Sequence, residues 1–302
     1  MNHAAASASV QNRIPEDRVL SGPSAGSSSL IAMWVLYTLT FRQHLHGRRW
    51  LVMAILFSLP VGLVVLIRAT APEFPAMNLE FGIAFMLIPQ ALLPIVALVY
   101  AAGIIRDEQE EQTLTYLLIR PIPRWAIYSV KLLATLTTTV LLTTVFTALT
   151  FVAIYVGSES SAGEVSLRCL KTIVMHDLAV IAYCCLFGLI SLLTNRTLVF
   201  GIVYSIIFEG LIANMPFGIR LITVIYYCRS IAYQWMSFKV NRYGHNIDFA
   251  ADAWNFDPKL MDEMTSIQTC VTILVVASLF FAGIASLLCA RREFHVKTPE
   301  GN

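Results

Sequence analysis

Long apolar stretches with almost no charge constrain this chain more than any other feature of its sequence. A helix needs roughly 20 consecutive apolar residues to cross the hydrocarbon core of a bilayer, and six stretches are about that long or longer. Backbone groups in lipid must find hydrogen-bond partners within their own segment, so each stretch predicts a helix. The six predicted spans are residues 50–67, 81–105, 126–156, 169–194, 197–215 and 267–290.

The composition agrees with an all-α integral membrane fold. Of the 302 residues, 57% are hydrophobic and 13% are charged, which is about half the charged fraction of a typical soluble domain. The net charge of +2 is too small to suggest nucleic acid as a partner. We therefore expect the chain to be surrounded by membrane lipid and to bind no nucleic acid.

Three regions outside the spans differ in character. Residues 1–29 are rich in Ala, Ser, Gly and Pro without an apolar period, which predicts a disordered tail. Residues 30–41 are apolar but too short to span, so we expect an interfacial helix there, at the start of a transmembrane domain covering 30–302. Residues 216–266 mix aromatic and charged side chains, which predicts an outer helical cap before the last span.

The most charge-dense run of the sequence lies between the second and third spans. Five of the six residues 106–111 are charged, so this run must lie in water. The apolar residues that follow fall at helical spacing and form one face of a short helix. They are Leu114, Leu117, Leu118 and Pro121. Two prolines within 120–124 then break the helix, so residues 106–125 predict a surface helix that ends in a stiff bend.

Lys and Arg residues in short loops predict the orientation, because they concentrate on the cytoplasmic side. If both termini are cytoplasmic, the two short outer loops carry only Arg68 and Arg168. The inner side then holds Arg42, Arg48, Arg49, Arg106, Arg120, Arg124, Lys131, Arg196, Arg291, Arg292 and Lys297. The charged bend is therefore expected in the cytoplasm and the aromatic segment outside. Lys131 lies near the start of the third span, from where its ammonium is expected to snorkel to the membrane surface.

The residues around the bend resemble the pattern of type-2 ABC exporter permeases, the membrane subunits of bacterial ABC transporters. The resembling residues are Glu108, Thr113-Leu114, Leu117-Leu118, Pro121, Arg124 and Lys131-Leu-Leu-Ala134. Beyond this stretch the resemblance rests on layout: an interfacial helix, six spans and an outer segment before the sixth. One departure is Gln112, where the family usually has Gly, so the local backbone is expected to be more regular here.

The resemblance implies that residues 106–125 are a cytoplasmic coupling helix that docks on a separate ABC ATPase subunit. It also implies two ATPase copies, a second permease copy, and ATP-driven export across the bacterial cytoplasmic (inner) membrane. No G-x-x-x-x-G-K-[ST] motif occurs, so ATP and Mg are expected in the partner, with no catalytic, metal or cofactor site in this chain. The implied coupling residues are Arg106, Asp107, Glu108, Glu111, Thr113, Leu114, Leu117, Leu118, Pro121 and Arg124.

Ionisable residues inside spans are rare and are candidates for function. His176 and Asp177 lie in the fourth span and Glu209 in the fifth. They predict a salt-bridge set near the outer leaflet, such as Lys171 with Asp177, or a polar gate on the export path, or a proton or metal role. Thr138 belongs to a threonine-rich third span, which predicts either close helix packing or a polar stripe along the path.

Two other functions are compatible with the sequence. A membrane-embedded hydrolase could use His176, Asp177 and Glu209, although no H-E-x-x-H motif occurs and these residues share at most two helices. A non-transporting mechanotransmission or assembly factor could use the same ATPase partner. The six cysteines show no C-x-x-C spacing, and a disulfide between Cys228 and Cys270, both expected near the outer face, is compatible with the sequence.

Overall fold

Six helices long and apolar enough to cross a membrane form the body of the protein, which confirms the predicted fold class. In the computed structural model the described residues are 25–104, 123–158, 160–215, 218–236, 238–242, 245–254 and 266–291. The six candidate spans are Arg49–Thr70, Ala76–Ala101, Arg124–Tyr155, Ala162–Leu193, Thr197–Asn214 and Ile267–Arg291. The largest shift from prediction is in the fourth, which begins at Ala162 rather than 169 because its polar first turns are also helical.

The predicted interfacial helix is longer than its apolar run. Helix α1 covers Ala25–His46, whereas residues 1–24 of the predicted tail lie outside the described residues. One side of α1 is buried through Leu36, Thr40 and His44, which recur every four residues. This side packs against α7 (Arg124–Tyr155), so α1 is anchored by a tertiary contact and not by lipid alone.

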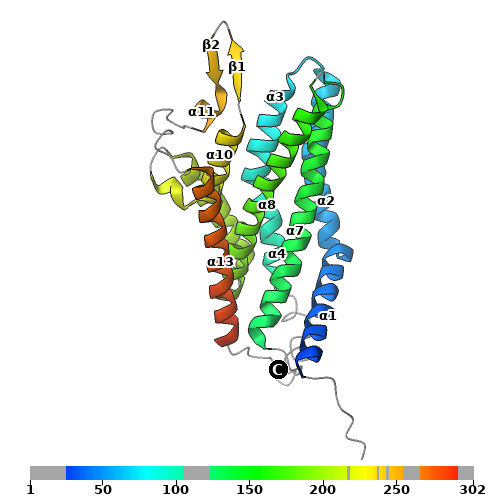
Figure 1. Cartoon of the computed structure of the whole chain (residues 1–302), viewed down its shortest axis with the longest axis vertical. Helices are drawn as coiled ribbons and strands as arrows, with labels where there is room; N and C mark the ends of the chain where they lie inside the picture. Colours follow the sequence, from blue (N-terminus) through cyan, green and yellow to red (C-terminus); the bar gives the residue numbers. More distant parts are fainter. Residues whose placement is uncertain are drawn as a thin grey trace, which may run out of the picture.

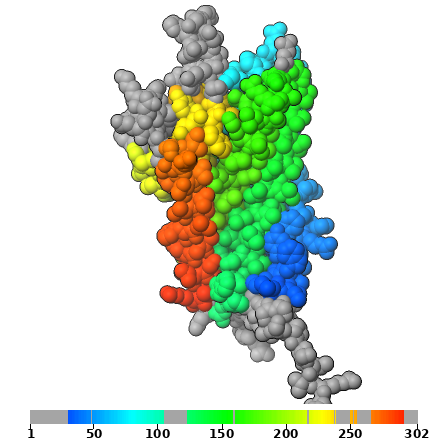
Figure 2. Space-filling view, in the orientation of Figure 1, coloured from blue at the N-terminus to red at the C-terminus, as the bar shows by residue number. Residues whose placement is uncertain are grey.

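Helices α7 and α8 (Ala162–Leu193) lie at the centre of the bundle (Figure 1). Helix α8 packs against α7, α4 (Leu93–Ala101) and α13 (Ile267–Arg291), while α1 and α2 (Arg48–Thr70) cover another side of α7. Figure 2 shows α13, in orange and red, beside the green helices of this centre. Helices α2 and α13 leave most of their apolar side chains at least partly exposed, as expected for faces that meet lipid.

The second span changes helical type along its length. It consists of α3 (Ala76–Leu79), the π-helical segment η1 (Glu80–Leu92) and α4. Pro89 lies inside η1, and Pro94 lies in the first turn of α4, which continues directly from η1, so each proline removes a backbone donor within the span. The fifth span is irregular too, with α9 (Thr197–Tyr204), the π-helical η2 (Ser205–Leu211) and the 3₁₀ segment η3 (Ile212–Asn214).

The outer segment packs into the bundle instead of lying loosely on it. It contains η4 (Gly218–Ile222), α10 (Val224–Trp235), the antiparallel strands β1 (Lys239–Arg242) and β2 (His245–Asp248), and α11 (Phe249–Ala253). Helix α10 packs against α8, α13 and η1. The prediction of a helical cap missed the hairpin.

Four aromatic rings join the outer segment to the second span. Phe238 makes edge contacts with Phe81 and Phe85 of η1 at centroid distances of 5.2 and 5.0 Å. Trp254 lies 5.2 Å from Phe81, and its indole N–H donates to the Met86 sulfur over 3.2 Å. The outer segment therefore rests on η1 through side chains that are almost fully buried.

The two ends of the bundle carry different elements. At one end lie α1, the start of α7 and the end of α13, and at the other lie α3 and the β1–β2 hairpin (Figure 1). We refer to them as the α1 end and the hairpin end.

Candidate functional site

The predicted coupling residues fall mostly outside the described part of the chain. Nine of the ten, from Arg106 to Pro121, lie in residues 105–122, which the structure does not describe. The tenth, Arg124, is the exposed first residue of α7. Its carbonyl accepts a hydrogen bond from the Cys289 thiol over 3.5 Å, which ties the start of α7 to α13.

Lys131 anchors the other flank of the undescribed stretch. Its ammonium donates to the carbonyl oxygen of Ile104 over 3.2 Å, and its side chain is only 4% exposed. The prediction that Lys131 snorkels to the membrane surface is therefore wrong. The ammonium finds a backbone carbonyl inside the protein, because the second span lies within reach of α7 at this level.

A buried ion pair joins the second and fourth spans at the hairpin end. The Glu80 carboxylate is fully buried at the start of η1, and the Arg168 guanidinium of α8 donates to both of its oxygens over 2.9 to 3.2 Å. The Tyr155 hydroxyl at the end of α7 donates to the same carboxylate. The guanidinium also lies 5.9 Å from the ring centre of Phe238. Three spans and the outer segment meet at this one charge pair.

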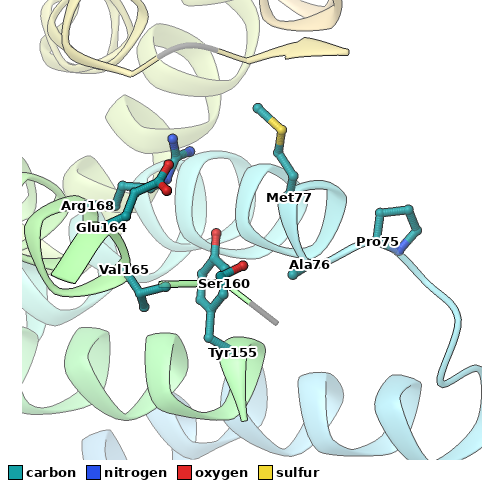
Figure 3. Close-up of a pocket in the computed structure, with 8 residues that line it drawn as sticks. All are labelled: Pro75, Ala76, Met77, Tyr155, Ser160, Glu164, Val165 and Arg168. Carbon is teal, nitrogen blue, oxygen red and sulfur yellow. The ribbon is translucent and has the colours of Figure 1, made fainter. Parts of the chain in front are cut away.

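A pocket of about 350 Å³ opens beside this ion pair. Figure 3 shows its wall, with Arg168 and Glu164 from α8, Tyr155 from α7, and Pro75 and Met77 from the start of the second span. The pocket lies at the hairpin end, and half of its labelled residues are polar or charged. It is the larger of the two described cavities, since the second, at the α1 end, has a volume of about 10 Å³.

His176 binds a backbone carbonyl at the kink of the second span. In a π-helix the carbonyl of residue i accepts from the N–H of residue i+5, so Ala84 would need the N–H that Pro89 lacks. His176 Nε2 lies 2.9 Å from that carbonyl oxygen and Nδ1 lies 3.0 Å from the Thr147 hydroxyl. Nε2 therefore carries the proton, and Nδ1 accepts from Thr147. A side chain of a neighbouring helix therefore satisfies the freed carbonyl.

Asp177 faces a different partner from the one predicted. Its Oδ2 accepts from the Thr144 hydroxyl over 3.0 Å, while Oδ1 is buried without a partner in the described part of the protein. Lys171 instead donates to the carbonyl of Trp235 over 3.3 Å, so the predicted Lys171–Asp177 ion pair is wrong. The two residues are six apart on one helix and cannot share a face, which requires a spacing of three or four.

Glu209 binds the start of α10. Its buried carboxylate accepts from the backbone N–H groups of Val224 over 3.1 Å and Ile225 over 3.0 Å, and from the Tyr204 hydroxyl over 3.0 Å. The first N–H groups of a helix have no partner within that helix and carry a partial positive charge. Glu209 is therefore a capping carboxylate that holds the outer segment to the fifth span.

Arg229 is a buried cation in α10 that the sequence analysis did not single out. Only 3% of it is exposed, and it donates to the amide oxygens of Asn214 over 2.9 Å and Gln90 over 3.2 Å. Burial lowers the pKa of its guanidinium below the ordinary value, although the nearby Tyr183 and Glu209 oppose this. Its Nε has no partner among the described atoms. Arg229 connects the second and fifth spans to the outer segment.

Thr138 belongs to a buried threonine face of α7. Its hydroxyl donates to the carbonyl of Ala134 over 2.9 Å, within the same helix. Most of the face is under 2% exposed, namely Thr135, Thr138, Thr139, Thr143, Thr147 and Thr150. These small side chains pack α7 closely against α8. The described geometry agrees with the packing role and leaves Thr138 with no open surface.

The residues of the hydrolase alternative do not form one site. His176 has both ring nitrogens engaged, Asp177 binds Thr144, and Glu209 binds the start of α10. Within the described residues no group of three His, Cys, Asp or Glu side chains could hold a metal ion. Residues 22–26 have the G-x-S-x-G spacing of a nucleophile elbow, but the residues before them do not read as a strand.

Cys228 and Cys270 are not joined to each other, so the disulfide that the sequence allowed is not formed. The Cys270 thiol donates to the Ser230 hydroxyl over 3.7 Å. Both cysteines are buried between α10 and α13, where they act as small apolar side chains.

Sequence reasoning missed Glu80, Arg229 and the buried position of Lys131. Glu80 and Arg168 were assigned to separate loops, and they lie 88 positions apart in the chain. Arg229 lay in a segment interpreted as a surface cap. A usable signal existed for Glu80, because an acidic residue directly before a long apolar run needs a cation at the same membrane depth.

The spans, the broken second and fifth helices and the buried polar contacts define a multi-pass membrane protein. Comparison with protein families matches residues 45–211 to the ABC-2 family transporter proteins. The match covers more than half of the 302 residues, so the chain belongs to this family and is a transporter membrane subunit, not itself a catalyst. Membership implies pairing with an ABC ATPase subunit. A comparison with curated proteins gives no match.

Proposed function

We propose that this chain is the permease subunit of an ABC exporter in the bacterial cytoplasmic membrane. Two copies form the path, and two copies of a separate ATPase bind ATP and Mg²⁺ and dock on residues 106–125. Family membership carries the proposal, together with the anchoring of both flanks of the charged bend. Lys131 holds Ile104 on one flank, and Cys289 holds the Arg124 carbonyl on the other.

Charge and the elements that share one end of the bundle support the proposed orientation. The first described helix and the end of α13 lie at the same end of the bundle, together with the start of α7 (Figure 1). Cationic residues are dense in the segments at this end, which favours the cytoplasm. We therefore propose that both termini and the coupling residues lie in the cytoplasm and that the hairpin end faces outward.

The second span is the proposed route by which motion of the bend reaches the outer segment. Its inner end adjoins the coupling residues, and its η1 portion contacts Phe238, Trp254 and Arg229 of the outer segment. Closure of the ATPase pair would move the bend and rock this span against its neighbours, which is the expected form of alternating access.

Of the four predicted path residues, Asp177 is the best candidate for meeting a substrate. Its Oδ1 has no partner in the described part of the protein, whereas His176, Glu209 and Thr138 are engaged in contacts that hold helices together. A buried unpaired carboxylate oxygen is costly in lipid and persists where function requires it. We therefore assign Asp177 to the path or gate, and the other three to the support of its walls.

Co-expression with the cognate ABC ATPase tests the docking. We expect the wild-type chain to purify with that subunit and with vanadate-sensitive ATP hydrolysis, and the Glu108→Lys and Leu117→Asp variants to lose both. Glu110→Lys makes the same change of charge two positions from Glu108, at a residue that is not among the predicted coupling residues, and serves as the matched control. Retention of the ATPase by both test variants would show that the bend is not the docking element.

Transport is separated from a purely mechanical role by reconstitution. In liposomes, an exporter shows ATP hydrolysis stimulated by its substrate and substrate movement that Asp177→Asn reduces. A mechanotransmission or assembly factor shows nucleotide-driven conformational change without either effect. Candidate substrates can be screened by the stimulation of hydrolysis, because this readout is the same for every chemical class of substrate.

A further inference from the structure

The pocket at the hairpin end is large enough to hold a small organic molecule. Its volume of about 350 Å³ lies within the range of ligand pockets, roughly 300 to 1,000 Å³. Side chains from the start of the second span, the end of α7 and the first turns of α8 form its wall (Figure 3). The three segments are joined to one another by the hydrogen bonds of the Glu80 carboxylate, so the pocket is formed before any ligand binds.

Arg168 lines the pocket but adds no net charge to it. Its guanidinium donates to both oxygens of the Glu80 carboxylate over 2.9 to 3.2 Å, and the Tyr155 hydroxyl donates to the same carboxylate. Glu80 is fully buried, so its negative charge is balanced by Arg168 and not by water. One cation and one anion cancel on this side of the pocket.

Glu164 gives the pocket its net negative charge. It lies in the first turn of α8, one helical turn before Arg168, and its side chain is exposed. Among the described residues its carboxylate acts on Arg168 through charge, without a hydrogen bond or an ion pair. Of the described residues that line the pocket, only Glu164 and Arg168 are charged. The Glu164 carboxylate is therefore available to a cation that enters the pocket.

The rest of the wall suits the apolar part of an organic cation. Pro75, Ala76, Met77 and Val165 present aliphatic and thioether groups, and the Tyr155 ring lies between them and the ion pair (Figure 3). Aromatic faces attract ammonium groups through the ring quadrupole, and apolar walls favour ligands that carry methyl or methylene groups.

A bare metal ion fits this wall poorly. Calcium takes about six to eight oxygen ligands, and magnesium requires near-octahedral coordination. The pocket offers one carboxylate outside the ion pair, and within the described residues no three His, Cys, Asp or Glu side chains form a metal-binding group. An anion would meet the Glu164 carboxylate and find Arg168 occupied by Glu80.

We propose that the pocket at the hairpin end binds a small organic ammonium ion. The ammonium group lies against the Glu164 carboxylate and the Tyr155 ring, and the apolar part of the ligand lies against Met77 and Pro75. The inference goes beyond the proposed function, because binding is a property of this chain and requires neither the ATPase nor transport.

Protection of a reporter cysteine tests the site in the full chain, reconstituted in nanodiscs free of choline lipids. Ser160→Cys places a thiol of nearly the same size in the pocket wall (Figure 3). The background carries Cys169→Ser, since the other five native cysteines are buried. The probe is choline, whose trimethylammonium group is a compact organic cation. A bound probe shields the reporter, so the labelling rate with a membrane-impermeant maleimide, measured against choline concentration, gives the dissociation constant.

We expect choline to slow the labelling, and potassium and the neutral isostere 3,3-dimethylbutan-1-ol to leave it unchanged at the same concentrations. Glu164→Gln should weaken choline binding about fivefold, the size expected for a solvent-exposed ion pair. Glu73→Gln is the matched control. It removes the same charge two positions before Pro75, from an exposed residue outside the pocket wall, and should leave the affinity unchanged.

Four results overturn the proposal. They are no protection by choline, equal protection by the neutral isostere, an unchanged affinity in the Glu164→Gln variant, and binding of glycine betaine at least as tight as that of choline. Betaine carries the same trimethylammonium group with an added carboxylate, so its tighter binding would identify a site for zwitterions. None of these results bears on the proposed function, which is tested by retention of the ATPase.

Discussion

The two ends of the bundle hold their helices together by different chemistry. At the hairpin end, full charges meet opposite charges or helix starts: Arg168 binds Glu80, and Glu209 caps α10. At the α1 end, the cation Lys131 binds a neutral carbonyl beside a small cavity. A buried charge pair whose hydrogen bonds are all satisfied resists rearrangement. An ammonium bound to a carbonyl can instead exchange that carbonyl for another carbonyl or for water. The hairpin end is thus held by paired charges, and the α1 end by a hydrogen bond from a charged group to a backbone carbonyl.

The largest effect is expected from breaking the closure at the hairpin end. Arg168→Met leaves the Glu80 carboxylate buried without its cation and should destabilise the protein by about 3 kcal/mol, at the low end for broken buried pairs because 15% of the Arg168 side chain is exposed. Thermal unfolding in lipid nanodiscs measures this loss. The double variant Glu80→Gln with Arg168→Met should recover most of it, and failure to do so would locate the loss in packing against Phe238.

Removal of the capping charge at Glu209 should have the next largest effect. Glu209→Gln keeps the shape of the side chain but loses the charge on the Val224 and Ile225 N–H groups, at a cost of about 2 kcal/mol. The start of α10 should then open locally, so amide hydrogen exchange at these two residues should accelerate. Glu164→Gln, an exposed carboxylate on α8, is the control and should change neither exchange nor stability.

His176 gives a sharper test of the kinked second span. His176→Phe should cost about 1.5 kcal/mol, because the Ala84 carbonyl and the Thr147 hydroxyl both lose their partner. Pro89→Ala supplies a backbone N–H near that carbonyl. The His176 substitution should therefore cost less stability in the Pro89→Ala background than it does alone. Equal costs in the two backgrounds would show that His176 is not needed to satisfy the carbonyl at the kink.

The smallest effects on stability are expected from substitution of Lys131 and Lys171. Lys131→Met and Lys171→Met should each destabilise the protein by about 1 kcal/mol, since each removes a bond from an ammonium to a backbone carbonyl. Their unfolding temperatures are expected to agree. A much larger loss for Lys131→Met would mean that the α1 end is as rigid a closure as the hairpin end, and the contrast between the two ends would fail.

The sequence by itself determined the membrane fold, because a bilayer leaves apolar segments of this length no other way to satisfy their backbone. It placed six spans within seven residues of their observed ends and indicated the family from the residues around the bend.

Only the tertiary structure decided which polar groups meet. Glu80 binds Arg168, not a neighbour in sequence, Lys131 turns inward to Ile104, and Lys171 and Asp177 point to separate partners. Hydropathy fixes the depth of a residue in the membrane but not the rotation of its helix, and rotation is set by side-chain packing between helices far apart in the chain. A group buried in lipid must bind whatever that packing brings within about 3 Å of it, so its partner follows from the assembled bundle.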